Sequence, residues 1–169
     1  QMCIRDSSVD ILDPQPLIDE LGLPYFRELA TFGALSDAGI LALLRGGQLW
    51  RLVQGEKLVR LNQAADDFQV VITGRMAFYK RGEQAEVFTR HFCPGDQTGF
   101  DLMIGMIPHN GTDIAEQESI LLSIDKALFY QMHLDHPADF GLLMINLARE
   151  LAREIALLED ALVEGFPGN

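Results

Sequence analysis

The stretch Phe92–Ile124, FCPGDQTGFDLMIGMIPHNGTDIAEQESILLSI, decides the fold that this sequence predicts. It begins as a strand, turns at Pro94-Gly95-Asp96, and continues as a short apolar helical turn that starts near Gly99. A loop over Pro108–Gly111 and two further strands follow. The first amides of a helix lack partners, so a helix start reached through a glycine favours an anion. From Gly99 to the end of the stretch there is no arginine or lysine. The shape of a phosphate-binding cassette is therefore predicted without its usual fixed cation.

Short strands separated by turns surround this stretch. They are rich in β-branched or aromatic residues and recur about every eight to twelve residues. The predicted strands are Gln48–Val53, Lys57–Leu61, Phe68–Thr73, Arg75–Lys80, Glu86–Phe92, Thr112–Gln117 and Ile120–Ile124. This pattern predicts a mainly β protein with flanking helices, built on an antiparallel β-roll or jelly roll rather than on a parallel sheet.

Helical periodicity marks both ends of the chain. We therefore divide it into an N-terminal helical segment at 9–46, a β-roll at 47–125 that contains the cassette at 99–115, and C-terminal helices at 126–165. The last helix carries a leucine and isoleucine stripe at intervals of three or four residues. The residues of this stripe are Leu143, Leu147, Leu151, Ile155, Leu158 and Leu162. A stripe of this length exceeds what the roll can cover, so it predicts a homodimer through this helix.

The composition limits the classes of partner. The chain has 169 residues, 48% of them hydrophobic, and a formal net charge of -12. This charge argues against nucleic acid and against an anionic membrane surface, since both are bound through lysine and arginine. Two cysteines and no apolar run of about 20 residues predict a cytoplasmic protein. Residues 1–8 contain QMCIRDS, which resembles a translated sequencing adaptor, and are interpreted as an adaptor-derived artefact.

Six motifs in order resemble the cyclic nucleotide-binding domain family, the sensory β-roll of catabolite-activator-type regulators. They are Phe32–Ser36 before a helix, Gly55-Glu56 after the first strand, Ala65–Val70, Gly74–Met76, Pro94–Gly99, and Ala115 with Leu121–Ile124. The resemblance covers roughly residues 25–160 and lacks the DNA-binding domain of those regulators. It implies a non-enzymatic regulatory module, here a stand-alone bacterial one, that takes a small ligand and no cofactor or metal.

The family's two ligand-binding side chains are replaced in this cassette. In the family, a glutamate after the second glycine holds the ribose hydroxyl and a later arginine pairs with the cyclic phosphate. Those positions carry Phe100 and either His109 or Asn110. The degenerate ligand-binding cassette comprises Gly99, Phe100, Asp101, Leu102, His109, Asn110, Gly111 and Thr112. Losing a charge-assisted bond costs about 1.5–3 kcal/mol, which predicts weak or altered ligand binding and a role in protein interaction. We further hypothesise that the Asp101 carboxylate caps the helix in place of a phosphate.

Two alternatives stay open. In the first, the domain is a genuine cAMP or cGMP sensor that uses His109 and main-chain amides. In the second, it is a cupin-like metal-binding protein, because His91-x-Cys93 precedes a Pro-Gly turn within a β-roll. The sequence contains no nucleophile elbow, phosphate-binding P-loop or dinucleotide fingerprint, so no catalytic residue is predicted.

Overall fold

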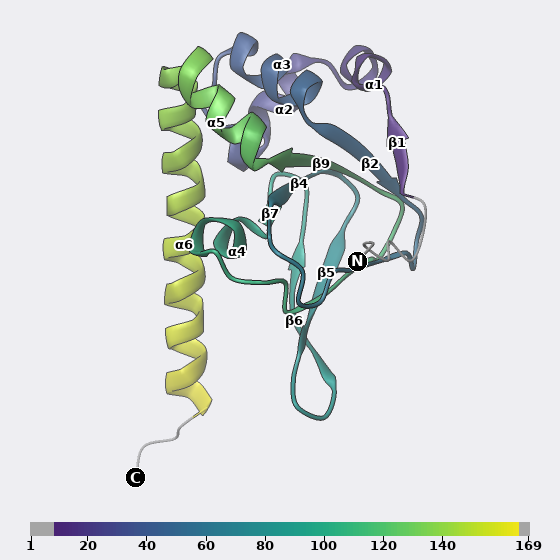
Figure 1. Ribbon diagram of the computed structural model, residues 1–169, viewed down its shortest axis with the longest axis vertical. Coiled ribbons are helices and arrows are strands. Elements are labelled where there is room, and N and C mark those ends of the chain that lie inside the picture. Colours follow the sequence, from purple (N-terminus) through teal and green to yellow (C-terminus); the bar gives the residue numbers. More distant parts are fainter. Residues whose placement is uncertain (1–8, 166–169) are drawn as a thin grey trace.

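The computed structural model describes residues 9–165. The predicted artefact at residues 1–8 lies outside the described residues. Figure 1 shows a β-roll with helices gathered at one end and a long helix along one side. No helix within residues 9–165 is long and apolar enough to cross a membrane.

The N-terminal segment is a strand followed by short helices. These elements are β1 (Asp10–Leu12), α1 (Pro14–Leu21), α2 (Leu23–Glu28), a 3-10 turn (Ala30–Phe32) and α3 (Asp37–Gly46). Side chains cap two of the helices: Gln15 N donates to Asp13 at 2.9 Å, and Gly39 N donates to Ser36 Oγ at 3.1 Å. Each cap satisfies an amide that the helix leaves without a partner.

Two antiparallel sheets form the roll. The first has the order β1-β2-β9-β4-β7, and the second has the order β3-β8-β5-β6. Their strands are β2 (Gln48–Leu52), β3 (Lys57–Val59), β4 (Asp67–Thr73), β5 (Met76–Arg81), β6 (Glu86–Phe92), β7 (Gln97–Thr98), β8 (Gly111–Ala115) and β9 (Ser119–Asp125). Between β7 and β8 lies the short helix α4 (Phe100–Gly105). The predicted fold class, an antiparallel roll with flanking helices, is confirmed.

The closing helices are α5 (Lys126–Asp135) and α6 (Pro137–Gly165). Two polar side chains of α6 bind the N-terminal segment. Asp139 accepts hydrogen bonds from the Ser36 amide and hydroxyl, both at 2.7 Å. The Asn146 amide donates to the carbonyl oxygens of Thr31 at 3.2 Å and Gly33 at 2.8 Å. The beginning of α6 is therefore fixed to a segment more than 100 residues earlier.

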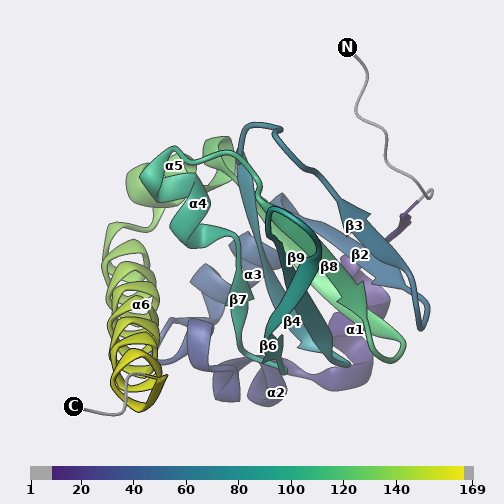
Figure 2. The ribbon, with the colours of Figure 1, turned by 90° about the horizontal axis from the view of Figure 1, so that it is seen from below.

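Apolar side chains form two cores. One lies inside the roll and includes Trp50, Leu52, Met76 and Leu121. The other joins the first sheet to the helices and includes Phe26, Phe32, Phe68, Ile40, Leu43, Leu143 and Leu147. Seen from below in Figure 2, α4 lies between the strands and α6. Helix α6 and the β-roll thus lie on either side of the cassette.

Candidate functional site

A cavity of about 560 Å³ lies against the cassette. Strands β5 to β8, the start of α4 and the later part of α6 contribute its walls. Its apolar lining includes Phe78, Phe92, Leu102, Leu157 and Leu158. A cavity of this size holds a small organic molecule, and mostly apolar walls with a few polar groups are usual for such sites.

The cassette helix is capped by a residue that precedes it. Gly99, with φ of +90°, is the N-cap residue of α4 and has no side chain that could accept a hydrogen bond from its amides. The Phe100 amide donates to Gln97 Oε1 at 3.1 Å. Among the described residues, Gln97 is the one side chain that accepts a hydrogen bond from the first amides of α4. The hypothesis that the Asp101 carboxylate caps α4 is therefore wrong. Asp101 instead is exposed and lines the cavity.

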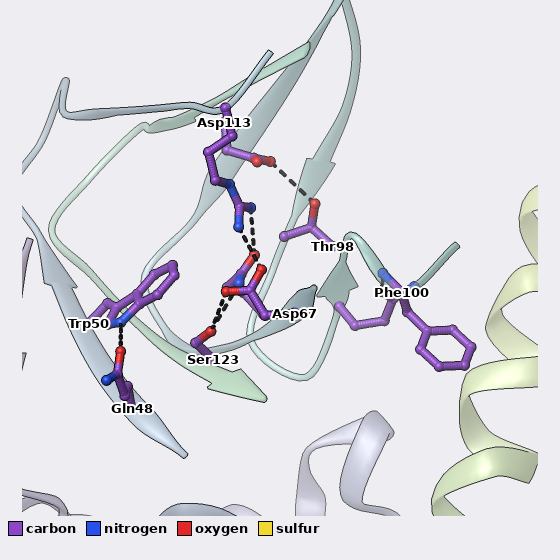
Figure 3. Close-up of polar contacts among 10 residues, drawn as sticks. Gln48, Trp50, Asp67, Thr98, Phe100, Asp113 and Ser123 are labelled. Carbon is purple, nitrogen blue, oxygen red and sulfur yellow. Dashed lines mark hydrogen bonds and ion pairs between the residues drawn. The ribbon is translucent and has the colours of Figure 1, made fainter. Parts of the chain in front are cut away.

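Phe100 belongs to the core rather than to the cavity. Its side chain is 1% exposed, and its ring packs edge-on against Phe68 and Phe129 with centroid distances of 5.3 and 5.9 Å. Figure 3 shows the ring directed away from Thr98 and Asp113. The position where the family has its ribose-binding glutamate therefore anchors α4 to the helical core.

Asp113 places a buried carboxylate in the cavity wall. It lies on β8, is 5% exposed, and accepts a hydrogen bond from the Thr98 hydroxyl at 3.3 Å (Figure 3). Burial raises the pKa of Asp113 to about 6, an effect that nearby Arg60 and the Thr98 hydrogen bond partly oppose. Burying a charged group costs free energy unless a partner compensates it, which is why the carboxyl group holds its proton more strongly here.

Arg60 lines the same cavity but is held in a closed ring of hydrogen bonds. Its guanidinium donates to Asp67 at 2.7 Å and to Gln69 at 2.8 Å. The Gln69 amide donates to Ser123 Oγ at 3.1 Å, and Ser123 Oγ donates to Asp67 at 3.0 Å. The guanidinium is mostly shielded, with 17% of the side chain exposed. Its charge is therefore matched by the Asp67 carboxylate inside the roll.

Arg90 connects the roll to α6. This residue of β6 pairs with Glu154, and its second terminal nitrogen lies 3.3 Å from Glu150. Its guanidinium carbon also stands 4.4 Å from the centre of the Phe92 ring. Burial raises the pKa of Glu150 and of Glu154 from their ordinary values. Arg90 and Glu154 both line the cavity, so this ion pair forms part of its wall.

His109 lies in the cavity wall and is neutral at physiological pH. It is 7% exposed, and burial, reinforced by the charge of Arg60, lowers its pKa to about 4. Main-chain bonds fix it, because its amide donates to the Gln63 carbonyl and its carbonyl accepts from the Asn62 amide, both at 2.9 Å. A neutral imidazole offers one hydrogen-bond donor but no positive charge.

The cavity gathers part of the predicted cassette. Its lining includes Gly99, Asp101, Leu102, His109 and Asn110. Among the described residues, Phe100, Gly111 and Thr112 do not line it. Thr112 Oγ1 donates to Glu86 at 2.8 Å, and a Cβ at Gly111 would overlap the Tyr79 carbonyl oxygen. These two residues therefore serve contacts between strands.

The basic side chains of the cavity were not predicted from the sequence. Arg60, Lys80 and Arg90 all line it, although the cassette itself contains no arginine or lysine. They come from the β3–β4 loop, β5 and β6, which only the folded roll brings to the cassette. Alternation along β5 was a usable signal, since Phe78 and Lys80 are two residues apart and face the same cavity.

The residues of the predicted metal motif have other partners. His91 Nδ1 lies 2.9 Å from Glu116, and the Phe88 ring lies 4.7 Å from the imidazole. Cys93 is a free, exposed cysteine. Within residues 9–165, no three or more histidine, cysteine, aspartate or glutamate side chains are placed to hold a metal ion.

The leucine stripe of α6 divides in two. Leu143 and Leu147 are buried in the chain's own core, and Leu151 packs against it. Farther along, Ile155 and Leu162 are 58% and 61% exposed. The part of the predicted dimer seam that remains accessible is therefore the second half of the helix.

Comparisons with known proteins agree with this geometry. The family model of the cyclic nucleotide-binding domain matches residues 49–136. A cyclic nucleotide-binding domain from Methylobacillus flagellatus has a TM-score of 0.78 and 17% identity, over 95% of this chain and 91% of that chain. The Thermus thermophilus catabolite activator protein has a TM-score of 0.66 and 21% identity, over 80% and 63% of the respective chains.

A third solved structure is the regulatory subunit of a cAMP-independent protein kinase A from Trypanosoma brucei. It has a TM-score of 0.64 and 14% identity, over 78% of this chain and 46% of that chain. Among curated proteins, no sequence match was found. The family model covers more than half of the sequence, and the roll, cassette and closing helices are in place. This chain therefore belongs to the cyclic nucleotide-binding domain family.

Proposed function

We propose that this chain is a non-enzymatic regulatory module that binds cyclic nucleotides weakly or in an altered manner and acts through contacts with other proteins. In this proposal the module works in the cytoplasm of a bacterium as a homodimer. The exposed apolar side chains of the second half of α6, among them Ile155 and Leu162, support the proposed dimer.

The observation that carries the proposal is the pairing of both cavity arginines with carboxylates. Arg60 is bound by Asp67, and Arg90 is bound by Glu150 and Glu154. An entering phosphate must compete with these carboxylates for each guanidinium and meets additional negative charge in doing so. The net gain from each new arginine–phosphate contact is therefore small.

Solved relatives indicate that the fold by itself does not decide the ligand. The Trypanosoma brucei subunit is described as part of a cAMP-independent kinase, and a triple mutant of it is described as bound to cAMP. One substitution in that mutant introduces an arginine and another removes a glutamate. The regulatory domain from Toxoplasma gondii is described as a complex with cAMP. Our proposal accordingly rests on the side chains of this cavity.

Freeing Arg90 tests the proposal directly. The double variant Glu150→Gln with Glu154→Gln keeps the size of both side chains and removes the carboxylates that hold this guanidinium. Since a hydrogen bond to a charged group contributes about 1.5–3 kcal/mol, we expect the variant to bind cAMP and cGMP at least about tenfold more tightly than the unmodified chain. Isothermal titration calorimetry measures both affinities.

The matched control changes two other glutamates of the same helix. Glu159→Gln with Glu164→Gln alters the net charge equally at exposed positions that do not line the cavity. We expect its affinity for cyclic nucleotides to equal that of the unmodified chain. Tight binding of cAMP or cGMP by the unmodified chain would contradict the proposal.

A second candidate function is cyclic nucleotide sensing through His109. The observation that favours it is the presence of His109 and Gly99 in one cavity wall. The same titrations distinguish it, because it requires tight binding by the unmodified chain and loss of that binding in His109→Ala. The lowered pKa of His109 makes it the weaker candidate, since the imidazole offers no positive charge to the phosphate.

A further inference from the structure

Asp113 is the most unusual polar group of the cavity. Its side chain is almost fully removed from solvent, in a wall otherwise rich in apolar side chains. Among the described residues, the Thr98 hydroxyl is the only hydrogen-bond donor to it, and that bond is long at 3.3 Å. A carboxylate has room for about four hydrogen bonds, so most of the capacity of Asp113 is unused.

The charges around the cavity favour a cation. Among the described residues, its basic side chains are Arg60, Lys80 and Arg90, whereas its own carboxylates are Asp101, Asp113 and Glu154. Two further carboxylates, Asp67 and Glu150, are bonded to its arginines. Both arginines are therefore paired, and the five carboxylates outnumber the three basic side chains, Lys80 included, by two. Among the described residues, neither Asp101 nor Asp113 forms an ion pair, although the charge of Arg60 partly offsets that of Asp113.

The shape of the cavity sets the rest of the ligand. Phe78, Leu102 and Leu157 supply apolar surface, and about 560 Å³ of space accommodates a ring system of moderate size. A purely polar ligand would leave these side chains without a partner. An apolar body with one cationic donor group uses both the walls and the carboxylate.

We propose that Asp113 binds the protonated amine of a cationic ligand with an apolar body, and that this residue makes the cavity select cations over cyclic phosphates. The inference rests on the proposed function, since it names the altered ligand of the same cavity. An ammonium group forms a charge-assisted bond with the carboxylate and replaces the hydration that Asp113 lost on folding. The raised pKa of Asp113 agrees with a carboxyl group that lacks such a partner in the unliganded chain.

The test uses two probes with the same ring system and opposite charge. Tryptamine carries a protonated amine, and indole-3-acetate carries a carboxylate. Calorimetric titration of the full chain is expected to show at least about tenfold tighter binding of tryptamine, and this preference is expected to disappear in Asp113→Asn. Equal affinity for the two probes, or a tryptamine affinity that Asp113→Asn leaves unchanged, would overturn the proposal.

Control variants separate the site from the net charge of the protein. Asp10→Asn removes one carboxylate from an exposed position on β1, away from the cavity lining, and should keep the full preference for tryptamine. If Asp113→Asn does not fold, Thr98→Val decides the matter. That change removes the Thr98 hydroxyl that donates to Asp113 and leaves the Asp113 carboxylate free. Retained or tighter binding of tryptamine by this variant supports the proposal, and loss of the preference for tryptamine over indole-3-acetate overturns it.

Separate results overturn the role of Asp113 and the proposed function. Tight binding of cAMP by the unmodified chain would overturn the proposed function, which the indole probes do not test. Absence of any charge preference between the two indole probes would overturn the role of Asp113 and leave weak cyclic nucleotide binding untouched.

Discussion

At the scale of single residues, Asp113 and His109 give the stability of the protein opposite dependences on pH. The folded pKa of Asp113 is about 6, above its ordinary value of 3.8, so its contribution to stability falls as pH rises through this window. The folded pKa of His109 is about 4, below its ordinary value of 6.5, so its contribution is lost as pH falls through that window. Between about pH 4 and pH 6, a rise in pH therefore lowers the stability through Asp113 and raises it through His109.

Single variants should expose the two slopes. In Asp113→Asn, the free energy of unfolding relative to the unmodified chain should increase with pH, by up to about 3 kcal/mol between pH 4 and pH 6. In His109→Gln, the free energy of unfolding relative to the unmodified chain should fall as pH rises over the same range. The reason is that this variant lacks the histidine, whose contribution to stability rises with pH. Urea unfolding followed by circular dichroism at several pH values measures both changes. Parallel slopes in the two variants would contradict the assigned pKa directions.

The residues of the site were only partly predictable from sequence. Gly99 and Asp101 line the cavity, and sequence could point to them because a glycine followed by a short apolar helix is a local pattern. The arginines could not be found in this way. Arg60 and Arg90 reach the cassette through strand pairing, and a register shift between Phe78 and Tyr79 alters which side chains of β5 and β6 face each other.

At the scale of elements, the contact between α3 and α6 depends on a glycine. A Cβ at Gly39 would lie 2.5 Å from the Asp139 carboxyl carbon, and that carboxylate binds Ser36. Gly39→Ala should therefore destabilise the protein by about 1–3 kcal/mol, because the added methyl group displaces Asp139. Thermal and urea unfolding measure the change.

Gly141 provides the matched control for this substitution. It lies in α6, and a Cβ added there would meet no other side chain or element within 4 Å, so Gly141→Ala removes only backbone freedom. We expect this variant to be more stable by up to about 1 kcal/mol. Destabilisation of both variants by equal amounts would argue against a specific contact between Gly39 and Asp139.

The elements themselves were predictable where they are long and bounded by turns. The strands from β2 to β6 and the helix α6 follow the predicted ranges closely, since Gly-containing turns and a sustained leucine period mark them. Two short strands escaped prediction. β1 and β7 contain three and two residues, too few to show an alternation, and only pairing with β2 and β4 defines them.

At the scale of the whole molecule, the proposed dimer depends on the second half of α6. Replacing Ile155 and Leu162 together by aspartate places charges on the exposed apolar face without touching the buried residues of the helix. We expect this double variant to be a monomer at concentrations where the unmodified chain is a dimer, because a charged face cannot be buried in a symmetric contact. Analytical ultracentrifugation measures the state of both.

The control for this experiment is Ala156→Asp, at an exposed position of the same helix about 100° around its axis from Ile155. It adds charge to α6 outside the proposed seam and should leave the dimer intact. A monomeric unmodified chain at tens of micromolar would contradict the dimer directly.

The attachment of α6 near its beginning has a mechanical consequence. Asp139 and Asn146 bind the N-terminal segment, whereas Arg90 pairs with the helix farther along, at Glu150 and Glu154. Beyond Asn146 the helix extends about 28 Å, at about 1.5 Å per residue, so a tilt of about 10° at that point carries its tip through about 5 Å. The helix thus has the geometry of a lever that turns about its attachment near Asn146. The Arg90 pairs, about 6 to 12 Å beyond that point, restrain the tilt.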